Sequence, residues 1–130
     1  MSAPITDEDL RRLVLDFTEA FNRDDLDAVM AYFAEDSVYD EFNGTRTEGK
    51  TAIRAVFEPQ FRGDFGSIRF RTEDVFAEAD SGKALVRWLC VLEKDGKMRA
   101  WRGLDVLRFE GGLLREKETY AKAPVPMLVP

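Results

Sequence analysis

Four carboxylates within the ten residues FAEDSVYDEF (33–42) form the densest group of side chains in this sequence that could transfer protons. A carboxylate directed into an apolar interior has the shifted pKa that acid–base chemistry uses, whereas one in water does not. On a strand, alternate side chains point to opposite faces, so Tyr39 and Glu41 share one face while Asp40 lies on the other. We therefore expect only one of the adjacent acids Asp40 and Glu41 to face inward.

Asp105 is the second carboxylate of interest. It has the strand parity of an otherwise apolar set: Trp101, Leu107 and Phe109. A carboxylate on such a face either has a charged partner or is kept neutral because burial raises its pKa. Both interpretations are open from the sequence: a neutral acid, or an ion pair with an arginine such as Arg87 or Arg115.

The sequence contains no histidine. Ser-His-Asp triads, Cys-His dyads and HExxH zinc sites are therefore excluded, and any chemistry must use carboxylates, lysine, tyrosine, arginine or the single thiol. That thiol, Cys90, lies in an apolar run without an adjacent basic residue, which favours core packing. We predict neither a metal nor a cofactor.

The composition predicts one globular domain. A chain of 130 residues with 45% apolar and 34% charged residues can bury one core. The net charge of −6 disfavours binding to nucleic acid or to an anionic membrane surface. No apolar run is long enough to span a bilayer, and the first residues lack a signal-peptide pattern. With one cysteine, a reducing cytoplasm is the expected location.

The first half of the chain has helical periodicity. Apolar residues at three- and four-residue spacing predict a helix over 6–22 with Thr6 as its N-cap. A second, shorter helix follows, capped by Asp24 or Asp25, and we expect it to run to about residue 34 with Phe33 on its inner face.

A short strand over 37–42 and a polar loop follow this second helix. A third helix is predicted to begin near Lys50 and to stop at Pro59, because proline lacks the backbone N–H that a helix needs.

The second half changes to strand periodicity. Turn signals (DSG, DG and GG) separate four predicted strands: 67–79, 83–94, 97–110 and 113–122. The 83–94 strand is apolar on both parities, so we expect helices to cover one face and a partner subunit the other. Helices followed by an antiparallel meander indicate an α+β fold with a curved sheet wrapped on helices.

The element order, with the segments DDLDAVMAYFAED (24–36), EGKTAI (48–53) and LDVLRFEGG (104–112), resembles the NTF2-like superfamily, and within it the ketosteroid isomerase and SnoaL-like polyketide cyclase branch. The resemblance implies a single domain over 1–130, with 1–6 and 123–130 as terminal extensions. It further implies three helices on a strongly curved, cone-shaped antiparallel or mixed sheet. An apolar pocket between helices and sheet, and a homodimer through the sheet, are expected.

The resemblance also implies roles for individual residues. Glu41 stands where the family has its general base, and Asp105 where a protonated acid donates to the enolate oxygen. Phe17 occupies the position of a tyrosine on the first helix, and Tyr39 could replace that missing hydroxyl. The expected ligand-binding residues are Phe17, Phe33, Phe57, Trp88, Trp101 and Glu118.

Three functions remain open from the sequence. The first is a cofactor-free isomerase, cyclase or lyase acting on a small apolar carbonyl compound through carboxylate acid–base catalysis. The second is a non-catalytic ligand-binding or dimerisation domain of the same fold. The third is an epoxide-hydrolase-like protein, which is weakened because Leu89 stands where an aspartate is wanted after Arg87.

Overall fold

The structure is a computed structural model that describes residues 5–122. The elements in chain order are α1 (Asp7–Ala20), the 3-10 turn η1 (Phe21–Arg23), α2 (Leu26–Met30), β1 (Phe33–Asp40), β2 (Arg46–Glu48), α3 (Lys50–Arg62), β3 (Ser67–Glu78), β4 (Lys83–Lys94), β5 (Lys97–Glu110) and β6 (Leu113–Ala121). The predicted terminal extensions lie almost entirely outside the described residues. Within the described part, no helix is both long and apolar enough to cross a membrane.

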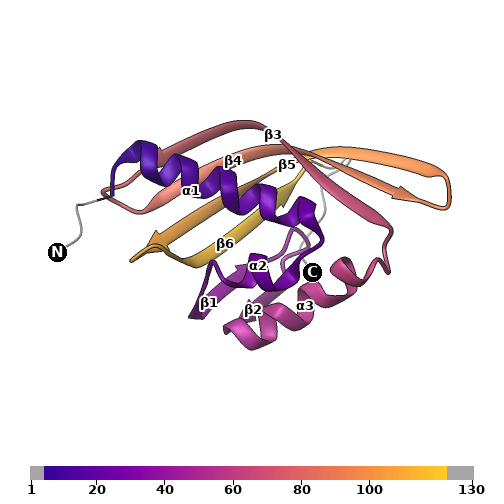
Figure 1. The fold of residues 1–130 in the computed structure, drawn as a ribbon, viewed down its shortest axis with the longest axis horizontal. Helices are drawn as coiled ribbons and strands as arrows, with labels where there is room; N and C mark the ends of the chain where they lie inside the picture. Colours follow the sequence, from indigo (N-terminus) through magenta and orange to yellow (C-terminus); the bar gives the residue numbers. More distant parts are fainter. Residues whose placement is uncertain (1–4, 123–130) are drawn as a thin grey trace.

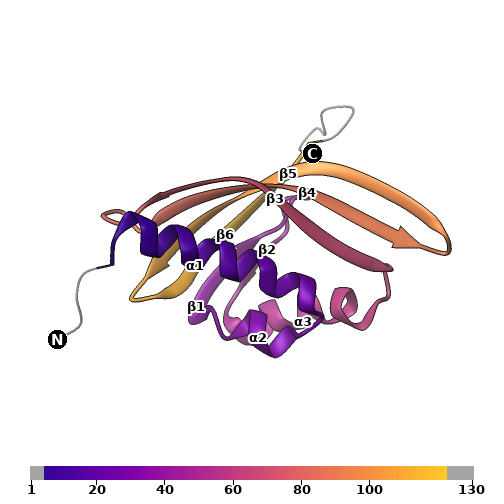
Figure 2. The same ribbon diagram turned by 45° about the horizontal axis from the view of Figure 1, so that its top comes forward.

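The six strands form one mixed sheet in the order β2-β1-β6-β5-β4-β3. β1 and β6 are parallel, and the other neighbours are antiparallel. The three α-helices lie on one side of this sheet (Figures 1 and 2). The α+β class is therefore confirmed. The sheet is open, with β2 and β3 as its edges.

α1 begins where the sequence predicts. The Thr6 hydroxyl accepts a hydrogen bond from the backbone N–H of Asp9, and the Asp9 carboxylate accepts one from the Thr6 backbone, both at 3.0 Å. This reciprocal cap satisfies two N–H groups that the helix itself cannot. Leu10, Val14 and Phe17 form the buried stripe that attaches α1 to the sheet.

α2 is shorter than predicted. Asp25 caps it by accepting from the Ala28 N–H, but the helix ends at Met30, and Phe33 opens β1 instead of lying on a helix. The reason is pairing across the chain: Phe33 lies opposite Leu114 of β6, and the Leu114 N–H donates to the Tyr32 carbonyl at 2.7 Å. Such pairing with a distant strand leaves no local signal in the sequence.

Two further predictions about the first half are corrected. α3 continues through Pro59 to Arg62, and ends at Gly63, which has φ of 88°. Pro59 lies close to the end of the helix. It lacks a backbone N–H, so the helix loses one hydrogen bond there but does not stop. The expected polar loop contains β2, whose three residues pair with the end of β1.

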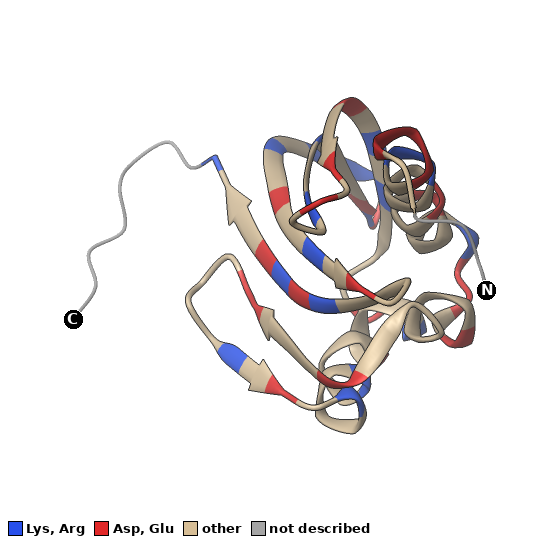
Figure 3. Ribbon diagram, turned by 90° about the vertical axis from the view of Figure 1, so that its left-hand side faces the viewer, with Lys and Arg blue, Asp and Glu red and all other residues tan. Residues whose placement is uncertain are grey.

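The second half agrees closely with the sequence. β4 and β5 have their predicted bounds, and Asp95 and Gly96 join them with φ of 54° and 75°, which a type I′ turn requires. Residues 5–122 cover the inner face of β4 more fully than its outer face: Val86 and Trp88 are buried on the inner face, whereas Leu85 and Leu89 are half-buried on the outer face. Charges of both signs alternate along β6 (Figure 3).

Candidate active site

A pocket of about 460 Å³ opens between α3, the end of β1 and the inner face of the sheet. This volume suits a small organic ligand. Its walls are mainly apolar: Phe21, Val56, Phe57, Ile68, Phe70, Trp88, Cys90, Leu92 and Trp101. Its polar lining residues are Tyr39, Glu41, Asn43, Gln60, Lys117 and Thr119. A few polar groups converging on an apolar hollow are typical of ligand and active sites.

Glu41 lies directly after β1 and lines the pocket together with Tyr39. The turn that follows holds its backbone, because the Glu41 N–H donates to Thr45 and the Gly44 N–H donates to Glu41, both at 2.9 Å. Among residues 5–122, no hydrogen bond or ion pair engages the Glu41 carboxylate. Its oxygens are therefore free to accept a proton from a ligand.

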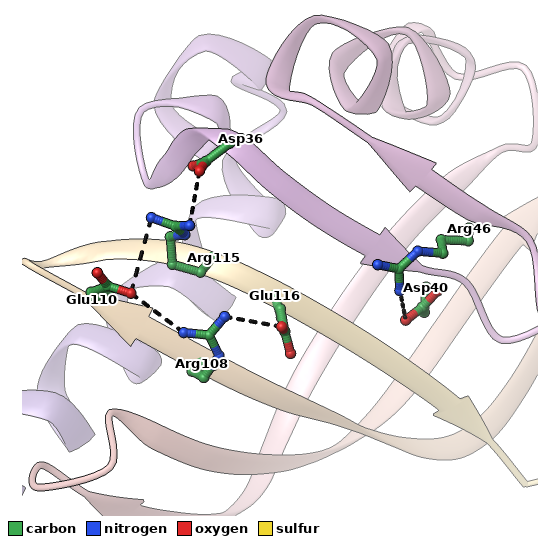
Figure 4. Close-up of polar contacts among 7 residues, drawn as sticks. All are labelled: Asp36, Asp40, Arg46, Arg108, Glu110, Arg115 and Glu116. Carbon is green, nitrogen blue, oxygen red and sulfur yellow. Dashed lines mark hydrogen bonds and ion pairs between the residues drawn. The ribbon is translucent and has the colours of Figure 1, made fainter.

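Asp40 lies on the opposite face, as strand alternation predicts. Its carboxylate is paired with Arg46 at 3.4 Å on the outer side of the sheet (Figure 4), whereas Ser37 and Tyr39 are buried on the inner side. Of the two adjacent acids, only Glu41 thus reaches the pocket.

Asp105 lies behind the pocket lining, 9% exposed, and accepts three hydrogen bonds from side chains of residues that line the pocket. Trp88 Nε1 donates to Oδ2 at 3.1 Å, while Lys117 Nζ at 3.0 Å and Thr119 Oγ1 at 2.6 Å donate to Oδ1. Both oxygens are therefore occupied as acceptors. Three donors on two oxygens is the environment of an ionised carboxylate.

The charged partner of Asp105 is neither of the expected arginines. Arg87 is exposed on the outer face of β4, and Arg115 pairs with Asp36 at 2.8 Å. The partner is Lys117, which stands among the alternating charges of β6. Register explains the contact: Thr119 pairs with Asp105 across β5 and β6, which places Lys117 next to it on the same inner face.

Lys117 is almost completely withdrawn from water, with 7% of its side chain exposed. Its Nζ donates to Asp105 and to Thr119, the latter at 2.8 Å, and lies 4.6 Å from the centroid of the Tyr39 ring. Burial is the largest single influence on the pKa of this amine and acts to lower it, but Asp105, Tyr39 and Glu41 together outweigh burial, so the pKa of Lys117 lies above its usual value. The side chain is an ammonium.

Tyr39 lies between this ammonium and the pocket wall. Its ring stacks on Phe57, with centroids 5.0 Å apart and planes inclined by 21°. Burial raises the pKa of the Tyr39 phenol although the nearby Lys117 opposes the shift, and the hydroxyl therefore remains protonated at neutral pH.

The structure divides the remaining expected ligand residues. Phe57, Trp88 and Trp101 line the pocket. Phe17 and Phe33 are instead core residues, each 1% exposed, with ring centroids 5.7 Å apart.

Glu118 does not line the pocket. It lies on the outer face of β6, where it accepts a hydrogen bond from the Tyr120 hydroxyl at 3.2 Å. The neighbouring outer surface carries an ion-pair group that Figure 4 shows: Asp36, Arg108, Glu110, Arg115 and Glu116. Glu118 and Lys117 are consecutive residues of β6, yet Glu118 lies on the outer face whereas Lys117 is buried on the inner face.

No group of three or more acidic or thiol side chains within residues 5–122 is arranged to hold a metal ion.

Comparison with known proteins agrees with this architecture. Residues 14–117 match the SnoaL-like domain family, and the chain belongs to that family. No curated protein sequence matches the chain.

Solved structures share the fold at low sequence identity. A proposed polyketide cyclase from Xanthomonas campestris pv. campestris superimposes with a TM-score of 0.77 at 22% identity, over 88% of this chain and 90% of that one. A proposed polyketide cyclase from Pseudomonas putida KT2440 has a TM-score of 0.71 at 24% identity, over 85% and 90%. An NTF2-like protein of unknown function from Mesorhizobium loti has a TM-score of 0.75 at 21% identity, over 90% and 93%. At such identities the likeness establishes the fold alone.

Proposed function

We propose that this protein is a cofactor-free enzyme that abstracts a proton next to the carbonyl group of a small apolar compound. The observation that carries the proposal is that Glu41, whose carboxylate has no partner in the part of the chain that the structure describes, lines the same apolar pocket that the polar cluster around Asp105 adjoins. Isomerases, cyclases and lyases share this proton abstraction as a first step. Two structural neighbours described as proposed polyketide cyclases are consistent with such chemistry.

Glu41 is the general base in this proposal. Removal of the proton leaves an enolate whose oxygen must be stabilised by donors already in place. Beside the cluster built on Asp105, the Tyr39 hydroxyl stays protonated and can donate to that oxygen. Asp105 itself accepts from three donors, so we assign it the role of ordering the cluster instead of the protonated donor that the resemblance implies.

The test is exchange of carbon-bound hydrogen for deuterium in D₂O, followed by NMR on a panel of neutral apolar ketones. This assay reports enolisation whatever the later steps are. We expect the wild type to catalyse exchange at the carbon next to the carbonyl, and Glu41→Gln to reduce the rate by roughly 10²–10⁴-fold, the usual contribution of a general base.

Glu35→Gln is the matched control, because Glu35 is an exposed carboxylate of the same strand and lies outside the pocket. It should exchange at the wild-type rate. Equal exchange rates in the wild type and in Glu41→Gln would show that Glu41 is not the base.

A non-catalytic ligand-binding domain is the alternative. It is favoured by one observation, that Phe17 is a core residue and supplies no hydroxyl at the position where the family has a tyrosine. Native mass spectrometry of the purified protein distinguishes the two functions. A ligand that remains chemically unchanged after incubation with the wild type, together with no exchange on any ketone, would favour binding alone.

The epoxide-hydrolase-like function is not proposed. It would need an arginine between two aspartates in the pocket, yet none of the described lining residues is an arginine, and Arg87 lies exposed on the outer face.

We also propose a homodimer through the outer face of the sheet. Leu85 and Val106 pair across β4 and β5 there, and Phe76 beside them is 63% exposed. Sedimentation at micromolar concentration should give a dimer, and Phe76→Glu should give a monomer because it places a charge in the apolar contact. A wild type that sediments as a monomer contradicts the proposal.

A further inference from the structure

Lys117 has a hydrogen-bond donor to spare at the floor of the pocket. An ammonium carries three N–H donors. Two are used, at 3.0 Å to Asp105 and 2.8 Å to Thr119, and no acceptor among residues 5–122 takes the third. Two aromatic rings also lie near Nζ, with the Tyr39 ring centroid at 4.6 Å and the Phe21 ring centroid at 5.7 Å. Both of these rings line the pocket, as does Lys117 itself.

We propose that Lys117 binds the carbonyl oxygen of the substrate and stabilises the enolate, with Asp105 as the positioning residue that holds the ammonium in place. This inference rests on the proposed function and names the catalytic cation for it. The hydrogen-bond donor to the substrate oxygen is thus Lys117 of β6, and not Asp105 of β5.

The surroundings of Lys117 suit this role. Asp105 and Thr119 fix Nζ from two sides, so the cation need not move when the oxygen becomes charged. The Lys117 side chain is only 7% exposed, and a charge withdrawn from solvent is less screened than it is in water. Because its partners keep the amine protonated, Lys117 acts as a cation and not as the neutral nucleophile that a Schiff base requires.

Every polar group that faces Lys117 favours its charged form. Asp105 faces it from β5, Tyr39 from β1, Thr119 from its own strand, and Glu41 acts on it across the pocket. None of these groups is a second cation. The ammonium therefore persists throughout the neutral range.

The charges in the pocket balance during the reaction. Glu41 accepts the proton, the C–H electron pair becomes a C=C bond, and the carbonyl electron pair moves to the oxygen. The negative charge thereby passes from Glu41 to the enolate oxygen at Lys117, and the total charge of the pocket does not change. Where the compound has a C=C bond next to the reacting carbon, Glu41 can return the proton to the far carbon of the conjugated enolate, the double bond shifts, and an isomerisation is complete.

This balance defines the substrate class. Before the reaction, Glu41 and Asp105 are negative and Lys117 is positive, so the pocket carries one net negative charge. This negative charge would repel a ligand that carries its own carboxylate, because like charges in a poorly screened site interact unfavourably. We therefore infer a neutral carbonyl compound with an apolar body.

4-Nitrophenol is a probe for the oxygen site, because its phenolate resembles an enolate and absorbs at a longer wavelength than the neutral phenol. The measurement is the pKa of the bound probe, obtained by pH titration of the absorbance. Glu41→Gln is the appropriate background, since the amide mimics the neutral, protonated base. In this background we expect the pKa of bound 4-nitrophenol to fall by roughly 1–3 units, as beside any close opposite charge.

Adding Lys117→Met to that background should abolish the fall. Adding Lys97→Met is the matched control, because Lys97 is an exposed lysine at the start of β5, outside the pocket, and this variant should preserve the fall. If Lys117→Met fails to fold, the variant that combines Asp105→Asn with Lys117→Met is used in its place, because it removes both buried charges together.

The role of Asp105 as a positioning residue has a separate readout. In Asp105→Asn the lysine loses its anionic partner, so burial lowers its pKa. Binding of the phenolate should then weaken as the pH rises through that lowered pKa. With Asp105 present, binding should stay constant over the same range, and a loss of fold alone would not produce such a profile.

A bound probe whose pKa is unshifted in the Glu41→Gln background, or whose shift survives Lys117→Met, overturns the inference. Failure of the proposed function looks different. In that case the probe would still bind as phenolate in a Lys117-dependent manner, while no ketone would exchange hydrogen in a Glu41-dependent manner.

Discussion

Lys117 Nζ and Asp105 Oδ1 lie 3.0 Å apart on neighbouring strands of the inner sheet face, and 7% and 9% of the two side chains are exposed. The cost of withdrawing two charges from water is offset only when further hydrogen bonds support the pair. Thr119 and Trp88 supply such bonds, and they leave one Lys117 donor without an acceptor among residues 5–122. Lys117 lines the pocket, whereas Asp105 is buried behind it.

Removal of one member of the pair should cost more than removal of both. Lys117→Met leaves a buried carboxylate without its cation, and we expect a loss of about 3–5 kcal/mol in the free energy of unfolding. The double variant Asp105→Asn with Lys117→Met should recover part of this loss. Urea denaturation of the wild type, both single variants and the double variant measures the coupling. Additive losses would show that the two side chains do not stabilise each other.

The protein should lose stability in alkali. The pKa values of Lys117 and Tyr39 are both raised in the folded state above their usual 10.5 and 10.0. A raised folded pKa contributes stability that is complete below the unfolded pKa and is lost as the pH rises through the folded one. We therefore expect the free energy of unfolding to decline from about pH 10 upward.

Variants separate the two contributions to that decline. Tyr39→Phe should make the decline shallower, and the Asp105→Asn with Lys117→Met variant should do so as well. The measurement is urea denaturation at several pH values between neutrality and alkali. The same slope in all three proteins would contradict the assignment to these two groups.

Tyr39→Phe should affect chemistry more than folding. The ring keeps its stacking on Phe57, so we expect the free energy of unfolding at neutral pH to change by no more than about 1 kcal/mol. Loss of the hydroxyl removes one donor near the developing oxyanion, which costs up to about 10²–10³-fold in rate. Deuterium exchange on a responsive ketone measures the effect. An unchanged rate would exclude the Tyr39 hydroxyl from the reaction.

Gly103→Ala should disturb the floor of the pocket. A Cβ at Gly103 would overlap the Trp88 ring and the Tyr120 carbonyl oxygen. Because Trp88 donates to Asp105, displacement of the indole would break that hydrogen bond and destabilise the fold by about 1–3 kcal/mol. Tryptophan fluorescence and urea denaturation report the two effects. Ala100→Val adds volume at an exposed position of the same strand and should be nearly neutral.

The fold was predictable where the signal is local. The Thr6 cap, the bounds of β4 and β5, and the Asp95-Gly96 turn follow from neighbouring residues whose spacing and backbone preferences decide the structure. Strand alternation also placed Asp40 and Glu41 on opposite faces correctly, because the period of a strand is a property of its backbone.

Predictions failed where a distant segment decides the outcome. Phe33 belongs to β1 because β6 pairs with it, and the end of the second helix could not be located without that strand. Pro59 remains inside α3 because one missing donor near a helix end is tolerated, although the same residue stops many helices.

The sequence alone determined that the chemistry of this protein, without histidine, would depend on groups such as Glu41 and Asp105, and that both carboxylates could face an apolar interior. It could not identify Lys117, which stands among the alternating charges of residues 115–118 and has no local feature that marks it as buried. Only the register of β6 against β5 places its ammonium beside Asp105, because strand alternation fixes which residues share a face but not which face is covered.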